Sequence, residues 1–234
     1  METPYVVLEL IGEQGSAKSK TQDVLRDFID PNQVNLRAKP KNRESLFVSA
    51  ENSHLISYEN LSHLQSELQD AFCTLATGGG IADRTLYTNK EETIIEVKRP
   101  VVLNGISVLV TAQDLLDRTF HIDMPRIINR KTEKEIEKEI SENKGTIWAG
   151  LLDLLADALK ILPSVKIGQK TLPRMADFAY LGEAVYRSLG KAEGNFLADY
   201  EANRYEGVHR TIDSSPVASK LIDFIDCSEN QEFK

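Results

Sequence analysis

The stretch that decides the fold is YVVLELIGEQGSAKS, residues 5–19. Its first part, residues 5–11, is mostly apolar and partly β-branched and ends at Gly12, which predicts a buried β-strand. A helical pattern follows over residues 18–28 and ends at the turn-forming pair Asp30-Pro31. A strand, a short Gly-containing loop and a helix in direct succession are the context in which phosphate-binding loops occur.

Residues 12–19 read GEQGSAKS and match the pattern Gly-x-x-x-x-Gly-Lys-Ser/Thr, except that Ala17 replaces the second glycine. We expect Lys18 to neutralise charge on the β- and γ-phosphates and Ser19 to ligate Mg²⁺. Ala17 is compatible with the loop if its φ is negative. A plain strand-to-helix turn is the alternative. The motif predicts ATP and Mg²⁺ as cofactors, with phosphates contacted by Gly12, Glu13, Gln14, Gly15, Ser16, Ala17, Lys18, Ser19 and Lys20.

A Mg²⁺ ion at such a loop also needs an acidic side chain at the tip of a neighbouring strand. Glu59 follows the apolar run HLISY, residues 54–58, and is the predicted metal-orienting and catalytic acid. Asn60 stands where related ATPases often carry a second acid that polarises water, so the hydrolysis rate is an open question. Glu51 is a weaker alternative, since it lies inside a predicted helix; a solvated strand-end carboxylate is the structural reading of Glu59.

The remaining pattern predicts an α/β fold with a mostly parallel sheet covered on both faces, followed by a helical subdomain. Strands are expected over 34–37, 54–58, 84–88, 93–98, 100–104 and 119–123, with 89–92 as a hairpin tip, and helices over 44–52 and 64–77. Further helices are expected over 133–143, 146–162, 174–189, 195–205 and 216–225. We therefore divide the chain into a core, residues 1–127, and a helical lid, residues 128–234.

Composition limits the possible functions. The 234 residues include 28 Lys and Arg against 36 Asp and Glu, a formal net charge of −8, so any contact with nucleic acid must come from a local basic feature. Neither the two cysteines nor the four histidines have metal-ligand spacing. We find no signal peptide and no apolar run near the roughly 20 residues that cross a bilayer. These features predict a cytoplasmic protein without a membrane partner.

Four runs carry a resemblance to a known family: YENLSH, LQDAFCTLATGGGIADRTLYTNKEE, KRPVVLNGI and DLLDRTFHIDMPRI. They resemble the AAA+ ATPases, and more narrowly the superfamily 3 helicase-like ATPases of phages and mobile elements. The resemblance covers residues 5–128 well and the helical remainder more loosely. It implies a P-loop sheet with a helical lid and assembly into a homo-oligomeric ring, a hexamer. Because the chain begins just before its first strand, we expect priming or origin recognition to come from a primase or initiator partner.

The resemblance implies three further site residues. Asn104, at the end of PVVLN, is similar to the sensor-1 residue that positions attacking water between the two nucleotide-binding strands. Arg118, in DLLDR, is similar to an arginine finger that stabilises γ-phosphate charge in a neighbouring subunit. Arg174 is similar to the sensor-2 arginine of the lid. The structural alternatives are a turn cap for Asn104, a surface ion pair with Asp117 for Arg118, and a first-turn surface position for Arg174.

The resemblance also implies that the hairpin over residues 84–98 grips single-stranded or duplex DNA in the channel of the ring. Lys90 at its tip would contact a phosphate, Tyr87 would stack on a base, and Arg84 would bind DNA or face the subunit interface. Two glutamates beside Lys90 weaken the positive field there. A structural or oligomerisation role for the whole hairpin is the alternative.

Three functions are compatible with these features. The first is an oligomeric ATPase acting as a DNA replication or helicase-like motor, which the resemblance implies. The second is an ATP-dependent switch or scaffold of a DNA-processing complex that hydrolyses slowly, which Asn60 favours. The third is a small-molecule kinase, which shares the P-loop and a helical lid; the DLLDR segment and the lack of an acceptor-site motif argue against it.

Overall fold

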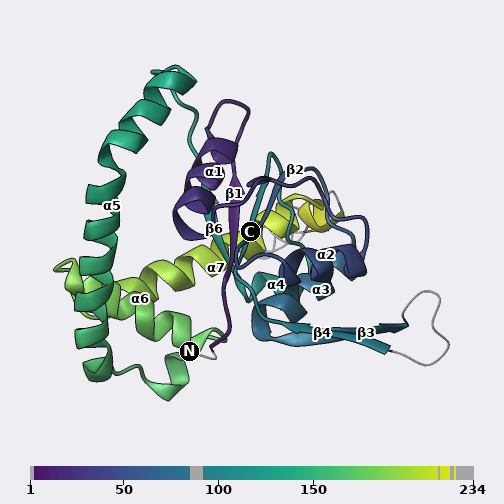
Figure 1. Ribbon diagram of the computed structural model, residues 1–234. Coiled ribbons are helices and arrows are strands. Elements are labelled where there is room, and N and C mark those ends of the chain that lie inside the picture. The colour runs from purple at the N-terminus through teal and green to yellow at the C-terminus, as the bar shows by residue number, and fades with distance from the viewer. Residues whose placement is uncertain (1–2, 85–91, 216, 222–223, 225–234) are drawn as a thin grey trace.

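The computed structural model describes residues 3–84, 92–215, 217–221 and 224. It has an α/β body, a two-stranded arm that leaves the body on one side, and a group of long helices on the other side (Figure 1). The α/β fold class predicted from the sequence is confirmed.

The body is built on a sheet of four parallel strands in the order β2-β5-β1-β6. The first strand is one of the two interior strands of this sheet, between β5 and β6, and its Val7 and Leu10 are almost fully buried. The strand expected over 34–37 is reduced to one isolated bridge between Arg37 and Tyr58. The four strands are β1 (Val7–Ile11), β2 (Ile56–Leu61), β5 (Val101–Gly105) and β6 (Thr119–Asp123).

Helices cover both faces of this sheet. Side chains such as Tyr58 and Leu103 join the main hydrophobic core with α2 and α3, whereas Val102 and Leu10 belong to a smaller cluster on the other face, where α1 lies. An Asn42–Ser45 capping box starts α2. The helices of the body are α1 (Lys18–Ile29), α2 (Arg43–Glu51), α3 (Ser66–Thr77) and the short α4 (Gln113–Leu116).

The arm is an antiparallel pair, β3 (Gly79–Arg84) with β4 (Glu92–Val97), and confirms the expected hairpin. Its first strand, however, lies earlier than the predicted 84–88. Gly78 ends α3 at a φ of +92°, and the chain turns directly into β3, so the glycines begin a strand instead of forming a loop. A Cβ at Gly80 would lie 2.6 Å from the carbonyl oxygen of Ile95.

After β6 the chain is helical, as expected. The two helices predicted over 133–143 and 146–162 form one helix of 29 residues, because a single glycine, Gly145, weakens a helix by about 1 kcal/mol without ending it. The helix expected over 216–225 lies partly outside the described residues; residues 217–221 are helical. The elements are α5 (Glu133–Ile161), the 3₁₀ turns η1 (Leu162–Ser164) and η2 (Gln169–Thr171), α6 (Ala176–Ser188) and α7 (Asn195–Asp213).

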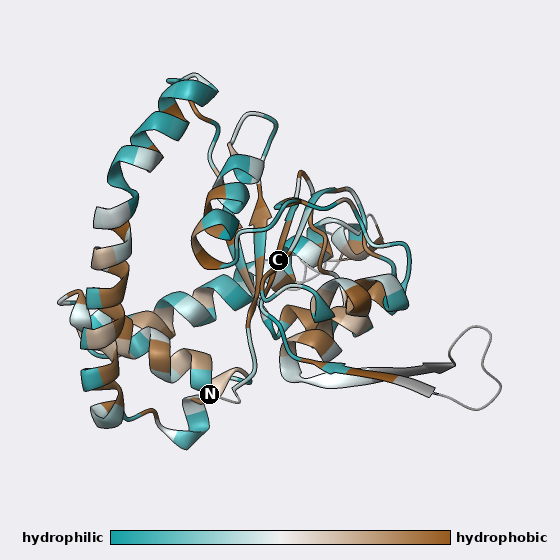
Figure 2. Cartoon of the chain, in the orientation of Figure 1, coloured by the Kyte–Doolittle hydropathy of each residue, from teal (hydrophilic) through white to brown (hydrophobic). Residues whose placement is uncertain are grey.

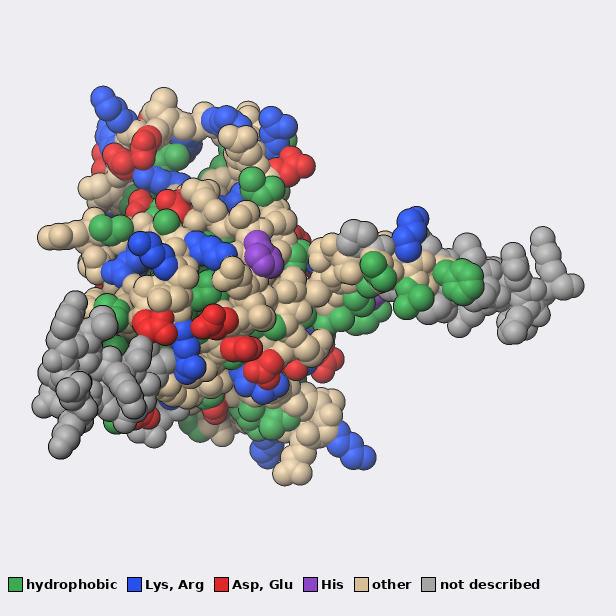
Figure 3. Space-filling view, turned by 90° about the vertical axis from the view of Figure 1, so that its right-hand side faces the viewer, with side chains coloured by type: hydrophobic (Ala, Val, Ile, Leu, Met, Phe, Trp, Pro, Cys, Tyr) green, Lys and Arg blue, Asp and Glu red, His purple; other side chains and the backbone are tan. Residues whose placement is uncertain are grey.

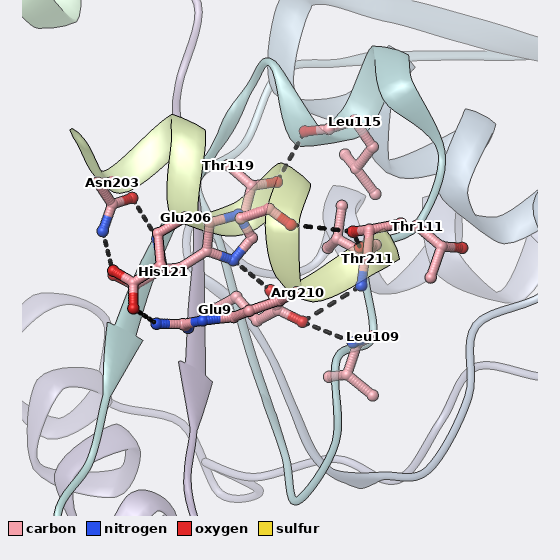
Figure 4. A network of polar contacts seen from close by, with 12 residues as sticks. Glu9, Leu109, Thr111, Leu115, Thr119, His121, Asn203, Glu206, Arg210 and Thr211 are labelled. Carbon is pink, nitrogen blue, oxygen red and sulfur yellow. Dashed lines mark hydrogen bonds and ion pairs between the residues drawn. The ribbon is translucent and has the colours of Figure 1, made fainter. Parts of the chain in front are cut away.

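A buried polar network ties the last helix to the sheet (Figure 4). Glu9 on β1 is fully buried; its carboxylate accepts backbone N–H bonds from Leu109 at 2.8 Å and Val110 at 3.2 Å and lies 2.5 Å from Nδ1 of His121 on β6. The side-chain amide of Asn203 on α7 bonds both the N–H and the C=O of His121. The one acidic residue of the apolar first strand therefore has its partners, and α7 is fixed to β6.

Figure 2 shows apolar residues concentrated inside the body and along the lower half of α5. Several large apolar side chains of that helix are between 39% and 54% exposed. No helix in the described part of the chain is long and apolar enough to cross a membrane. The exposed apolar side chains of α5 are Ile147, Trp148, Leu151, Leu152, Leu155 and Leu159.

Candidate nucleotide site

A cavity of about 590 Å³ opens at the carboxyl ends of the central strands. Such an edge of a parallel sheet is where α/β proteins commonly bind ligands. The motif loop forms one wall, and the segments that follow β2 and β5 form the other. The cavity is lined by Gln14, Gly15, Ser16, Ala17, Lys18, Ser19, Lys20, Asn60, Leu61, Ser62, Gly105, Ile106 and Ser107.

The loop between β1 and α1 has two residues with positive φ. Gly15 has a φ of +88°, which glycine adopts without strain. Ala17 has a φ of +59°, in the left-handed region, so the condition of a negative φ, under which alanine fits the loop without strain, is not met. A Cβ in that region costs about 1–2 kcal/mol, which explains why a glycine is usual at this position of the motif. The loop keeps its shape despite the alanine and carries backbone strain there.

Lys18 folds back over the loop. Its Nζ donates to the carbonyl oxygen of Gly12 at 2.5 Å, to that of Glu13 at 2.9 Å and to Oγ of Ser16 at 3.2 Å. Only 9% of the residue is exposed, and this burial lowers the pKa of its ammonium group. The ammonium group is therefore held in the centre of the loop by oxygens that carry no net charge.

Asn104 connects the loop helix with the end of β2. It is fully buried on β5, the strand that lies between β1 and β2. Its Oδ1 accepts the N–H of Asn60 at 2.9 Å, and its Nδ2 donates to Oε1 of Gln22 at 2.5 Å and to Oγ of Ser19 at 3.5 Å. The structure thus brings Lys18, Ser19 and Asn104 together.

Gln22, one turn after Lys18 on α1, is a residue that sequence reasoning missed. Its Nε2 donates to Oγ of Ser57 and to the carbonyl oxygens of Tyr58 and Val102. The signal available in the sequence was a polar side chain on the face of the helix that is expected to pack against the sheet. Gln22 fixes the start of α1 against β2 and β5 and orients the amide of Asn104.

The expected acid, Glu59, is not among the residues that line the cavity. Strand β2 is irregular between Tyr58 and Leu61, and Asn60 has a φ of +53°. This irregularity places Asn60 in the cavity lining, whereas Glu59 is not part of it. The described residues of the lining include no aspartate or glutamate. Ser19 and Asn60 therefore line the cavity, and Glu59 lies outside that lining.

Arg118 and Arg174 lie at the opposite end of the sheet. The carbonyl oxygen of Arg118 accepts the N–H of Val7, the first residue of β1, whereas the cavity begins after the last residue of that strand. Arg118 pairs with Asp114 at 2.7 Å, and not with the expected Asp117. Arg174 pairs with the other carboxylate oxygen of Asp114 at 2.7 Å. The structure does not bring Arg174 to the phosphate loop of its own chain, and any role of Arg118 at a phosphate requires a second chain.

A third arginine, Arg130, lies beside the loop. The N–H of Ile127 donates to the carbonyl oxygen of Gly15 at 3.1 Å, which ties the segment after β6 to the loop. A Cβ at Gly15 would collide with Nη2 of Arg130. Within the described residues, Arg130 has no carboxylate partner, since no ion pair includes it. Sequence reasoning missed it because the parallel pairing of β6 with β1 that brings it there is non-local.

The predicted DNA-binding hairpin is described only in part. Arg84 is the last residue of β3, and Tyr87 and Lys90 lie outside the described residues.

Residues 2–202 match the family described as actinomycete integrative conjugative element replication protein. No curated protein matches the sequence. Two solved apo A-form structures of the NrS-1 C-terminal region are similar at 13% identity. Their TM-scores are 0.41 and 0.39, and the matches cover 85% and 87% of this chain and 60% and 62% of those chains. This chain therefore spans less than two thirds of their length, and TM-scores below 0.5 do not establish a shared fold. Because the family match extends over most of the sequence, the chain belongs to the replication proteins of actinomycete integrative conjugative elements.

Proposed function

We propose that this protein binds ATP with Mg²⁺ in the cavity at the motif loop and hydrolyses it as part of DNA replication of its mobile element. The observation that carries the proposal is the geometry of the loop. Strand β1, a tight loop with positive φ at Gly15, and helix α1 surround a buried ammonium group that only neutral oxygens hold. An anion is the natural ligand of such a site, because the N-terminus of α1 and Lys18 both favour negative charge.

The residues around the loop fit a nucleoside triphosphate. The lack of a Cβ at Gly15 leaves the loop backbone open toward Arg130. Lys18 can exchange the carbonyl oxygens of Gly12 and Glu13 for phosphate oxygens, and the hydroxyl of Ser19 is a Mg²⁺ ligand type. When bound, Mg²⁺ neutralises charge on the β- and γ-phosphates. Asn104 then holds the Ser19 hydroxyl and the backbone of Asn60 on either side of the cavity.

The position of Arg118 supports the further proposal that copies of the chain assemble into a ring, a hexamer. Its guanidinium lies at the amino end of the sheet and reaches a phosphate only in a neighbouring copy. A head-to-tail interface of this kind would bring the amino end of one sheet to the cavity of the next, and such interfaces form rings when the rotation between copies closes.

A slowly hydrolysing, ATP-dependent switch is the second candidate, and one observation favours it. Asn60 rather than Glu59 faces the cavity, and the described lining holds no carboxylate that would orient Mg²⁺ or polarise water. The two candidates share the nucleotide site and differ in turnover.

The test measures ATP affinity and ATP turnover of the full chain with Lys18→Ala, and with Lys166→Ala as a matched control on the exposed surface of the helical half. We expect Lys18→Ala to lose at least tenfold in ATP affinity, since hydrogen bonds to charged groups contribute about 1.5–3 kcal/mol, whereas Lys166→Ala behaves as wild type. Equal ATP affinity of Lys18→Ala and wild type would contradict the proposal. Wild-type binding without measurable turnover would select the switch.

A further inference from the structure

The segment that joins α1 to α2 is the most basic stretch of an acidic protein. Residues 31–43, PNQVNLRAKPKNR, contain four cationic side chains and no carboxylate, in a chain of net charge −8. The four cations are Arg37, Lys39, Lys41 and Arg43. Since bulk charge does not attract this protein to nucleic acid, such a local feature is what binding would require.

Residues 37–43, the basic half of this segment, are anchored to the body at both ends. The N–H of Arg37 donates to the carbonyl oxygen of Ser57 at 3.1 Å, and its Nη2 donates to Oγ of Ser53 at 3.2 Å. Arg43 lies over the ring of Phe47, 5.7 Å from its centroid, and its Nη2 donates to the carbonyl oxygen of Gly80 at 3.2 Å. The two arginines therefore hold the segment in one position.

The two lysines between these anchors point outward. Pro40 is buried, and Lys39 and Lys41 on either side of it are exposed. In the described part of the chain neither lysine has an ion-pair partner, whereas Lys20 pairs with Asp23 and with two glutamates of α5. The two ammonium groups are thus fully available to an external anion, on a backbone that is already ordered.

The segment continues the surface from which the arm leaves the body. The N–H of Glu59 donates to the carbonyl oxygen of Arg37, so the segment lies along the outer edge of β2, and Arg43 is bonded to Gly80 at the root of β3. On the face turned toward the viewer in Figure 3, Lys and Arg side chains are visible across the upper half, with some Asp and Glu side chains among them, and a band of Asp and Glu crosses the lower half.

We propose that residues 37–43 bind the sugar-phosphate backbone of DNA, with Lys39 and Lys41 as the contacting cations and Arg37 and Arg43 as the residues that position them. Contacts of this kind fix the position of the protein on DNA and carry no sequence information. The inference rests on the proposed role in DNA replication but not on ATP hydrolysis, and it does not depend on the tip of the arm.

The test titrates a fluorescently labelled single strand and its duplex with the full-length protein at several salt concentrations. We expect Lys39→Glu/Lys41→Glu to weaken binding at least tenfold at low salt. The slope of log affinity against log salt should also become shallower, by about 1.4 for the single strand and about 1.8 for the duplex, because each of the two lost phosphate contacts removes about 0.7 for single strands and 0.9 for duplex. Lys166→Glu/Lys170→Glu is the matched control: the same charge change on two exposed lysines of the helical half, with wild-type affinity expected.

Lys39→Gln/Lys41→Gln removes charge without reversing it, and we expect an intermediate loss of affinity with an unchanged thermal midpoint. An equal loss in the control pair would overturn the proposal, because bulk charge would then explain the effect. Wild-type affinity of Lys39→Glu/Lys41→Glu, or no binding of wild type to either DNA at low salt, would also overturn it. ATP affinity measured on the same samples separates this failure from a failure of the nucleotide site.

Discussion

At the carboxyl end of the parallel sheet Lys18 is held by neutral oxygens, whereas at the amino end Arg118 and Arg174 share the carboxylate of Asp114. At the same end, Asp117 forms an ion pair with Arg204 at 2.6 Å. The pairing with Arg118 holds the pKa of Asp114 below its usual range, so this carboxylate stays charged. One end of the sheet therefore offers cations to an external anion, and the other end satisfies its cations internally.

The two ends of the sheet therefore differ in how an anion would meet their cations. An anion that enters the cavity competes only with backbone carbonyls and a hydroxyl for Lys18. An anion that approaches Arg118 competes with a carboxylate, and Arg118 is only 9% exposed. Arg118 is thus held in place by Asp114, whose other carboxylate oxygen pairs with Arg174. We expect changes at the carboxyl end to alter binding and changes at the amino end to alter turnover.

The largest expected effect tests this division at Arg118. Arg118→Ala should reduce ATP turnover by about 10³-fold, the usual contribution of an arginine supplied by a neighbour, while ATP affinity stays at the wild-type level. Arg174→Ala, on the same aspartate, should keep most of the turnover. Steady-state ATPase rates and equilibrium nucleotide binding measure the two quantities separately.

Mixing the two inactive variants, Arg118→Ala and Lys18→Ala, adds a second test. ATP turnover can recover in the mixture only if both variants are folded and share active sites. In a head-to-tail ring, random one-to-one mixing sets an intact loop beside an intact arginine at about one site in four. Recovery of about a quarter of the wild-type turnover would locate Arg118 in the site of its neighbour. No recovery, or loss of ATP affinity in Arg118→Ala, would contradict the division between the two ends.

The parts of the site that the sequence predicted are local ones. Lys18 and Ser19 follow from the strand, loop and helix that contain them, and Asn104 ends an apolar run that is a strand. The parallel sheet follows from the alternation of strands and helices. Each of these predictions needs only a pattern within a few residues.

The parts that it missed depend on non-local pairing or on local backbone irregularity. Arg130 lies beside Gly15 because β6 pairs with β1 in parallel register, Ile11 opposite Asp123. Asn60 replaces Glu59 in the cavity because the register of β2 shifts after Tyr58. Neither feature has a signature in residue types.

An intermediate effect is expected at Arg130, which lies beside the loop at the carboxyl end of the sheet but outside the sequence motif. A role there would add Arg130 to the ATP site. Arg130→Ala should weaken ATP binding about tenfold, because a charged hydrogen bond contributes about 1.5–3 kcal/mol and Arg130 is exposed. Lys131→Ala removes the same charge from the next residue, whose ammonium pairs with Glu139 at 2.6 Å, and should bind as wild type. Calorimetric titration with ATP compares the three proteins. Equal affinities would assign Arg130 to the general surface.

The smallest expected effect concerns the folding stability of the loop at the carboxyl end of the sheet. Ala17→Gly should raise the free energy of unfolding by about 0.5 kcal/mol, because it removes a left-handed strain of about 1–2 kcal/mol and adds an unfolded-state entropy cost of about 0.5–1 kcal/mol. Ala38→Gly is the control: Ala38 lies in an exposed loop and is not among the residues with positive φ, so glycine there should lower stability. Chemical denaturation of both variants measures the sign. If both glycines destabilise equally, the left-handed conformation of Ala17 is not a source of strain in this loop.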